Sequence, residues 1–251
     1  MFTLSFPVKL PGEHTFFDNG QYPIPPLPGG LSFRCFSNEN APLVLQISGF
    51  ATEQDAMDFC PILRSALRVA ALDCEHSVTP SVATPTLSIE KHFDGSVPTV
   101  TPTKTGAMPY HTTTSMQTGL HISVLSKLVG TSLAQGSPAK VNGKPELALS
   151  LELYSDCQFA GERNAQFIVL MTALEILVPK ASAKGKRGKV IGLVKQALSR
   201  AGHSDPKSAG KVLDALYVAR NALLHEAKPV TDPELADLKD IVRCTLKALI
   251  E

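Results

Sequence analysis

Several features that would place a chain in a class at first sight are missing from this 251-residue sequence. No run of apolar residues approaches the roughly 18 that a membrane-spanning helix requires. The first residues, Met1–Lys9, contain neither a basic leader with a long apolar core nor a small-residue cleavage site. Hydrophobic residues make up 43% and charged residues 19% of the chain, as in globular proteins. We therefore expect a cytoplasmic protein without a membrane partner.

The familiar motifs for metals and nucleophilic catalysis are also missing. Neither His203 nor His225 has a histidine or cysteine three or four residues away, which argues against a structural zinc site. The sequence contains no Gly-x-Ser-x-Gly and no His-Glu-x-x-His motif. We therefore expect no metal and no cofactor. The cysteines form no Cys-x-x-Cys pair and are expected to be free, mostly buried thiols: Cys35, Cys60, Cys74, Cys157 and Cys244.

Charge is nearly balanced overall, with a formal net charge of +1, but it is unevenly distributed. Eleven lysines and arginines and three acidic residues lie between Lys180 and Lys228, whereas residues 1–150 carry nine basic and eleven acidic residues. A local positive field attracts polyanions such as RNA. The alternative is a lysine-rich helix face that is merely solvated. We interpret the Lys/Gly run 184–189 as a flexible connection whose basic residues bind RNA: Lys184, Lys186, Arg187 and Lys189.

The first part of the chain, residues 1–117, is predicted to form a small α/β domain with an unknown ligand or regulator. Strands are expected at Phe2–Lys9, Leu31–Phe36 and Leu43–Ile47. Thr52 is a good N-cap for a helix over Glu53–Leu72. Residues 77–117 are rich in Ser, Thr and Pro, and form edge strands, a flap or a linker. Weak strand candidates within this region are Thr86–Ile89 and Val97–Val100.

Helical periodicity dominates the rest of the chain, residues 118–251, so the predicted fold class is α+β with an all-α second domain. Two Asp-Pro pairs, at 205–206 and 232–233, signal helix starts because aspartate caps a helix and proline suits its first turn. Helices are expected at Leu120–Thr131, Pro145–Cys157, Arg163–Val178, Val190–Ala201, Lys207–His225 and Pro233–Ile250.

One stretch, residues 216–225, places polar side chains where a core helix should be apolar. Asn221 and His225 share one face of the expected helix, roughly 100–140° from Arg220. Because an unpaired guanidinium is costly to bury, Arg220 either reaches solvent, pairs with an acid such as Glu175, or joins Asn221 and His225 in binding an anion. On the expected helix, an apolar stripe surrounds Arg220 and consists of Leu213, Leu216, Tyr217, Leu223 and Leu224.

The pattern Arg-Asn-x-x-x-His in this stretch resembles the Arg-x(4–6)-His signature of the HEPN superfamily of helical domains. As that family favours, a polar residue directly follows the arginine. The earlier segment Phe167–Leu177 is similar to the family's "F…ALE.L" helix, particularly in its Apea-like branch. The resemblance covers about residues 145–251 and implies an α-helical HEPN-like bundle for this half of the chain.

The resemblance further implies a metal-independent endoribonuclease. The RNA 2′-hydroxyl would attack its own phosphodiester, His225 would act as general acid or base, and Arg220 would stabilise the phosphorane. Asn221 would orient the imidazole or donate to the phosphate. Glu175 is either a core acid paired with Arg220 or a residue that orients it, and Tyr217 either packs in the core or stacks on a base.

In the resembling family two such motifs meet across a homodimer, and the leucine-rich stripe around Arg220 would then form the subunit interface. His225, in the last helical turn before Pro229, would approach Arg220 if the backbone unwound there. Proteins of this kind serve as toxins or antiviral defence effectors. Two alternatives remain open: a non-catalytic HEPN-like module for RNA binding, nucleotide binding or dimerisation, and an activity that resides in the N-terminal domain.

Overall fold

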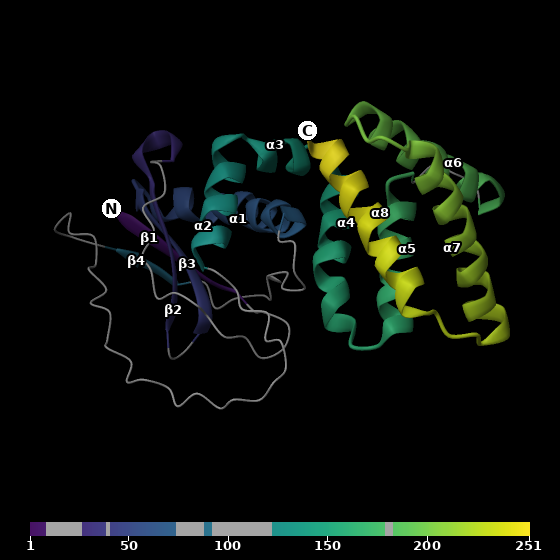
Figure 1. Cartoon of the computed structure of the whole chain (residues 1–251). Helices are drawn as coiled ribbons and strands as arrows, with labels where there is room; N and C mark the ends of the chain where they lie inside the picture. The colour runs from purple at the N-terminus through teal and green to yellow at the C-terminus, as the bar shows by residue number, and fades with distance from the viewer. Residues whose placement is uncertain (9–26, 39–40, 74–87, 92–121, 179–182) are drawn as a thin grey trace.

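The computed structural model describes residues 1–8, 27–38, 41–73, 88–91, 122–178 and 183–251. Figure 1 shows a small sheet near the N-terminus and a group of long helices at the other end of the molecule. Helices predominate and the strands pair antiparallel, so the predicted α+β class is confirmed. No helix in these ranges is long and apolar enough to cross a membrane.

The sheet is built from four strands in the order β2-β3-β1-β4, and every neighbouring pair is antiparallel. Leu4 and Phe6 face Ile47 and Leu45 across the β1–β3 pair, and side-chain alternation gathers these apolar residues on one face. The predicted strand Val97–Val100 lies outside the described residues. The strands are β1 (Phe2–Val8), β2 (Ser32–Asn38), β3 (Ala41–Phe50) and β4 (Ser88–Lys91).

Two helices, α1 (Glu53–Asp73) and α2 (Ile122–Ala134), join the apolar face of the sheet in one hydrophobic cluster. Thr52 and Asp55 cap α1 reciprocally, because the Asp55 amide donates to Thr52 Oγ1 at 3.1 Å and the Thr52 amide donates to Asp55 Oδ2 at 3.0 Å. The sheet and these two helices therefore share one core. The predicted boundary between residues 117 and 118 stays a prediction.

Helix α1 also contacts the second hydrophobic cluster of the molecule. Val69 and Leu72 near its C-terminal end are buried in that cluster, and Arg68 forms an ion pair with Glu152 at 3.3 Å. Asp73 forms another ion pair with Lys247. A short helix that the sequence analysis did not predict, α3 (Ser137–Asn142), follows α2 and packs against α1.

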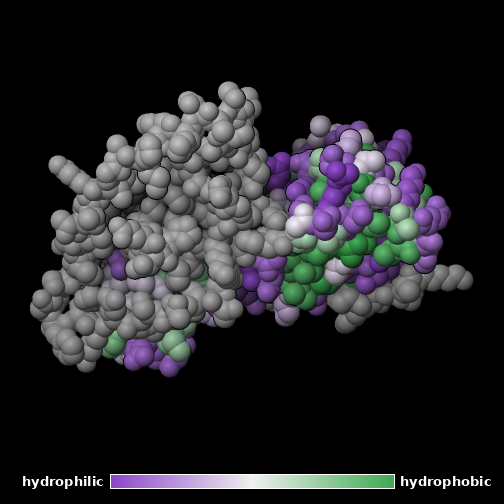
Figure 2. Space-filling view, turned by 90° about the horizontal axis from the view of Figure 1, so that it is seen from below, coloured by the Kyte–Doolittle hydropathy of each residue, from purple (hydrophilic) through white to green (hydrophobic). Residues whose placement is uncertain are grey.

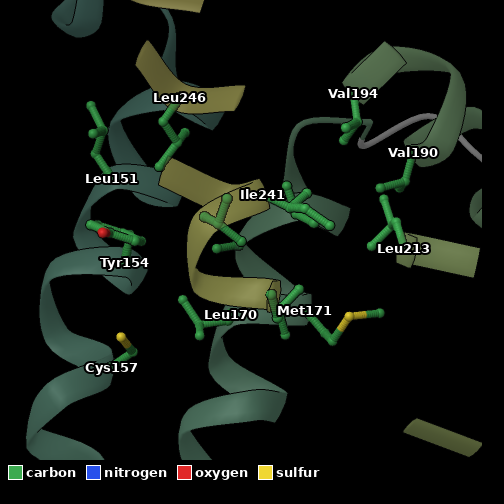
Figure 3. Close-up of a cluster of buried hydrophobic side chains, with 14 of the residues drawn as sticks. Leu151, Tyr154, Cys157, Leu170, Met171, Val190, Val194, Leu213, Ile241 and Leu246 are labelled. Atoms are coloured by element: carbon green, nitrogen blue, oxygen red, sulfur yellow. The ribbon is translucent and has the colours of Figure 1, made fainter. Parts of the chain in front are cut away.

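The second cluster is the core of a helical bundle, whose side chains Figure 3 shows converging from all five of its α-helices. Helices α4 and α5 pack side by side, as do α6 and α7, and α8 packs against α4, α5, α6 and α7. The described cysteines, Cys60, Cys157 and Cys244, are free and at least partly buried. The bundle comprises α4 (Pro145–Asp156), the short η2 (Cys157–Ala160), α5 (Arg163–Ile176), α6 (Ala183–Arg200), α7 (Pro206–Glu226) and α8 (Asp232–Ile250).

The expected flexible connection over residues 184–189 is wrong, because these residues form the first turns of α6. Glycines disfavour a helix by roughly 1 kcal/mol each, and basic residues at a helix N-terminus oppose the helix dipole, so the local sequence argued against this start. Tertiary contacts act in the opposite direction. Arg187 pairs with Asp214 of α7, and Lys186 pairs with Glu175 of α5.

Candidate functional site

Helix α7 carries the residues of the candidate site. Its first turn is capped by Asp205, whose side chain accepts a hydrogen bond from the Ser208 amide at 2.9 Å. The helix continues through Glu226 and ends at Ala227, which adopts a left-handed conformation with φ 53°. The backbone is therefore helical at His225, so the unwinding that would bring this residue nearer Arg220 is not seen in this structure.

The inner side of α7 is part of the bundle core. Leu213 is 0% exposed, Leu216 is buried, and Tyr217 is 5% exposed, and all three belong to the second hydrophobic cluster, in which Figure 3 labels Leu213. The prediction that the leucine stripe around Arg220 forms a subunit interface is therefore wrong for these residues, because they already pack inside their own chain. Leu224 differs, since it is 52% exposed.

Arg220 lies between the buried and the exposed sides of α7, with its side chain 30% exposed. Its Nη2 atom is 3.9 Å from Oε1 of Glu175, a residue of α5 whose side chain is 16% exposed. This separation is an ion pair but is too long for a hydrogen bond. The Arg220 Nε atom is buried and has no hydrogen-bond partner among the described residues. The predicted Arg220–Glu175 pair is thus present but loose.

Two more groups complete the cluster around Glu175. Lys186 of α6 places its Nζ atom 3.8 Å from Glu175 Oε2, so one carboxylate lies between cations from two different helices. The buried Tyr217 hydroxyl has no partner of normal hydrogen-bond geometry in the described structure. Burial and the negative charge of Glu175 raise the pKa of the Tyr217 phenol above its usual range, with Arg220 and Arg187 acting in the opposite direction. The phenol therefore stays protonated and can donate.

The other basic residues predicted to bind RNA have different surroundings. Arg187 is held by α7, since its Nε donates to Asp214 Oδ1 at 2.7 Å and its Nη2 donates to the Asp214 carbonyl at 3.1 Å. Its guanidinium also lies 5.8 Å from the ring centroid of Tyr217. Lys189 is exposed on the next turn of α6, and the side chain of Lys184 lies outside what the structure describes. Arg187 is thus a structural link, whereas Lys189 is accessible.

The remaining motif residues, Asn221 and His225, are exposed on the outer side of α7. Among the described residues, no hydrogen bond or ion pair joins them to Arg220, which instead faces Glu175. Val218, 58% exposed, and Leu224 lie on the same stretch of helix. Figure 2, a view of the molecule from below, shows hydrophobic patches among hydrophilic side chains on the surface of the bundle.

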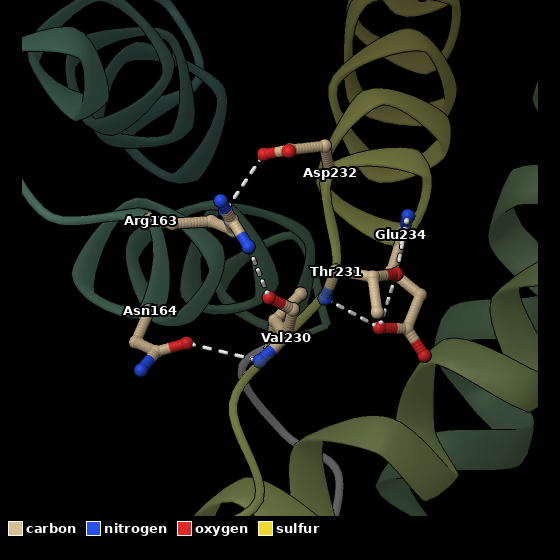
Figure 4. A network of polar contacts seen from close by, with 6 residues as sticks. All are labelled: Arg163, Asn164, Val230, Thr231, Asp232 and Glu234. Atoms are coloured by element: carbon tan, nitrogen blue, oxygen red, sulfur yellow. Dashed lines mark hydrogen bonds and ion pairs between the residues drawn. The ribbon is translucent and has the colours of Figure 1, made fainter.

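The turn that follows His225 is fastened to the start of α5, as Figure 4 shows. Arg163 Nη1 donates to the Val230 carbonyl at 3.0 Å, and the Val230 amide donates to Asn164 Oδ1 at 3.0 Å. Arg163 also pairs with Asp232 at 2.7 Å. These contacts hold the end of α7 in place relative to α5.

The capping of α8 differs in detail from the prediction. Thr231, rather than Asp232, is the N-cap, and it forms a capping box with Glu234. Hydrogen bonds from the Thr231 amide and hydroxyl, both 2.8 Å long, lower the pKa of the Glu234 carboxyl. The threonine-x-x-glutamate spacing in the sequence is the signal that would have identified this cap.

The sequence analysis grouped Arg220 with Asn221 and His225, which the structure places on another side of α7. It did not group Arg220 with Lys186, which the structure places beside the same carboxylate. It assigned Lys186 to a loop, whereas this lysine shares Glu175 with Arg220. It assigned no role to Arg163 and Asn164. Within the described ranges, no group of three or more His, Cys, Asp or Glu side chains is arranged to hold a metal ion. Comparisons with models of protein families, with curated proteins and with solved structures found no match.

Proposed function

We propose that this protein is a metal-independent endoribonuclease of the HEPN type, with Arg220, Asn221 and His225 as its site residues. The observation that carries the proposal is Arg220 itself. It is a partly buried arginine with an unpartnered Nε group in the described structure, loosely paired, and five residues before an exposed histidine on the same helix. A guanidinium held in this state is suited to a phosphate, whose oxygens accept two hydrogen bonds from its planar fork.

The chemistry follows from the residue types. The 2′-oxygen of RNA forms a bond to phosphorus and the bond from phosphorus to the 5′-oxygen breaks, which leaves a cyclic phosphate and a 5′-hydroxyl. One imidazole takes the proton of the 2′-hydroxyl, and another gives a proton to the leaving oxygen. Arg220 stabilises the extra negative charge of the phosphorane.

A second copy of the chain would supply the second imidazole. The exposed pair Val218 and Leu224 flanks Asn221 and His225 on α7, which suits an apolar contact between two such helices. Because the leucines of the inner side are already buried, this contact would involve the outer side of the helix. A homodimer of this kind places two histidines beside one RNA phosphate.

The test is cleavage of labelled single-stranded RNA and tRNA in EDTA by the intact chain and by His225→Ala. We expect the intact chain to cut and leave cyclic phosphate ends, and the variant to lose at least about 100-fold in rate, the scale of a lost general acid or base. His203→Ala is the matched control, since His203 is exposed on another part of the bundle. Cleavage that persists in His225→Ala would contradict the proposal, as would an active protein whose mass by light scattering is that of a monomer.

The second candidate function is a non-catalytic module that binds RNA or a nucleotide through the same residues. The exposed basic residue Lys189 and the loosely paired Lys186 favour nucleic-acid binding whether or not cleavage follows. Binding without cleavage by the intact chain would select this candidate. If cleavage is found, a toxin or antiviral defence role for the protein, with its N-terminal part as sensor, is the proposal that the HEPN resemblance suggests.

A further inference from the structure

The described bundle contains an unusual arrangement in which one carboxylate is shared by two cations that it does not contact closely. Glu175 on α5 lies 3.9 Å from Arg220 Nη2 on α7 and 3.8 Å from Lys186 Nζ on α6. Ion pairs built for stability have donor–acceptor distances of about 2.7–2.9 Å. Arg187 and Asp214, a few residues away, reach 2.6 Å in the same structure. The Glu175 pairs are therefore loose by comparison with a neighbouring pair.

Two polar groups beside this carboxylate make no hydrogen bond of normal geometry in the described structure. Tyr217 is 5% exposed and its hydroxyl is buried, and the Arg220 Nε atom is buried as well. Leaving a buried donor without an acceptor costs about 1–3 kcal/mol, so such groups call for an explanation. Both are donors. The Tyr217 hydroxyl faces Glu175, whose charge and hydrogen bond add to the effect of burial in raising the pKa of the phenol, and Arg220 approaches the same carboxylate through Nη2. An acceptor with several oxygens would satisfy them together.

Charge points in the same direction. Lys186 and Arg220 carry two positive charges and Glu175 carries one negative charge, so the trio has a net charge of +1, and the neighbouring pair Arg187–Asp214 is neutral. All three side chains are partly accessible from solvent. An anion can therefore reach the cluster and would be attracted to it.

We propose that Lys186, Arg220 and the Tyr217 hydroxyl form a phosphate-binding subsite, and that Glu175 holds the two cations in the free protein until an RNA phosphate displaces it. The inference rests on the proposed function for its ligand, a phosphodiester of RNA. It adds Lys186 and Tyr217 as binding residues and assigns Glu175 the role of a competitor for the phosphate. Glu175 then lowers RNA affinity in the free protein.

This assignment differs from the simpler one in which Glu175 orients Arg220 for catalysis. An orienting carboxylate contributes to binding, so its removal weakens the complex. A competing carboxylate opposes binding, so its removal strengthens the complex. The two roles predict opposite signs for the same variant, Glu175→Gln, which keeps the shape of the side chain and removes its charge.

The experiment measures the affinity of the full chain for a fully 2′-O-methylated single-stranded RNA, which cannot be cleaved because its 2′-oxygens carry no proton. Fluorescence anisotropy is recorded over a series of salt concentrations. We expect Glu175→Gln to bind about two- to fivefold more tightly and Lys186→Met to bind about two- to fivefold more weakly, in line with loss of one partly exposed charge interaction. Lys186→Met should also reduce the slope of log affinity against log salt by about one.

Lys127→Met is the matched control, because it removes the same charge from an exposed position on α2, outside the basic segment between Lys180 and Lys228. Its affinity should change by about twofold or less if the subsite is local. Tyr217→Phe should weaken binding modestly without changing the salt slope, since it removes a donor and no charge. Circular dichroism and thermal unfolding establish that each variant is folded.

Three results would overturn the inference: unchanged or weaker binding by Glu175→Gln, equal losses in Lys186→Met and Lys127→Met, or an unchanged salt slope in Lys186→Met. The proposed function fails by a different signature. If the affinity changes appear as expected and the intact chain cuts no RNA, the subsite stands and the nuclease proposal falls. If His225→Ala abolishes cleavage while Glu175→Gln leaves affinity unchanged, the nuclease proposal stands and the subsite falls.

Discussion

The two sides of α7 differ in what holds their residues in place. On the inner side, Leu213 and Tyr217 are enclosed by the bundle, and at its margin Arg220 pairs with Glu175 of α5. On the outer side, Asn221 and His225 are exposed. The inner residues are fixed by packing, whereas the outer ones depend on the helix itself and on the turn that follows it. A site that uses residues from both sides needs a rigid helix, which keeps Arg220 at a fixed position relative to Asn221 and His225.

The largest effect should come from shortening a side chain on the inner side. Leu213→Ala removes buried atoms from a fully enclosed position and should lower the free energy of unfolding by about 2–5 kcal/mol. Leu224→Ala, on the exposed side, should lower it by about 0.5 kcal/mol or less. Urea unfolding of both variants measures the difference.

Equal losses in the two variants would contradict the comparison. They would mean that Leu224 is enclosed in solution, as it would be in a homodimer that forms through the outer side. Repeating the measurement over a range of protein concentrations separates these cases, because the stability of a dimer depends on concentration and that of a monomer does not.

An intermediate effect is expected at the turn that supports the outer side. Asn164→Ala removes the acceptor of the Val230 amide, which belongs to a residue 2% exposed. A buried amide left without a partner costs about 1–3 kcal/mol. Asn221→Ala is the matched control, since it removes the same side chain from an exposed position and should change stability by about 0.5 kcal/mol or less.

The two asparagines also differ in what else they should affect. Hydrogen exchange at the amides of the α7–α8 turn should accelerate in Asn164→Ala and stay unchanged in Asn221→Ala. RNA cleavage should behave in the opposite way, with the larger loss in Asn221→Ala if that residue contacts the phosphate or the imidazole. Faster exchange in both variants would mean that the outer side is held by Asn221 as well.

Local signals in the sequence were sufficient for much of the fold. The capping signal of Asp205, Pro206 as the first residue of the helix, and the apolar stripe of α7 predicted that helix to within one residue at each end. The alternation of Leu4 and Phe6 in β1 predicted a strand whose apolar face is buried. These features depend on neighbours a few residues apart, which a sequence displays directly.

Long-range contacts account for what the sequence did not predict. The start of α6 contains Gly185 and Gly188, which disfavour a helix locally, and it is held by pairs to Glu175 and Asp214 on other helices. The contact between Arg220 and Glu175 likewise depends on where α5 lies relative to α7. The sequence pattern placed the motif on one helix, but helical rotation keeps Arg220 and His225 on different sides of it.

The smallest effect we predict is the pH dependence contributed by Tyr217. Burial raises the pKa of its phenol, so the folded protein keeps this proton in alkaline solution while the unfolded chain releases it above about pH 10. Stability from this group is therefore full below about pH 10 and falls as pH rises, by up to about 1.4 kcal/mol per pH unit. Tyr217→Phe abolishes that fall and leaves stability near neutral pH unchanged or slightly higher, because it removes an unpartnered hydroxyl.

The measurement is urea unfolding of wild type and Tyr217→Phe at pH 9 and pH 11 in the presence of a reductant. From pH 9 to pH 11 the free energy of unfolding of the variant should rise by about 1 kcal/mol relative to that of the wild type. Tyr154→Phe is a useful parallel, because burial raises the pKa of Tyr154 in α4 to about 12. This substitution should change the pH dependence of stability in the same direction as Tyr217→Phe. If Tyr217→Phe shows no gain while Tyr154→Phe does, the Tyr217 hydroxyl is open to solvent. The inner side of α7 would then be less enclosed at Arg220 than the packing of Leu213 suggests.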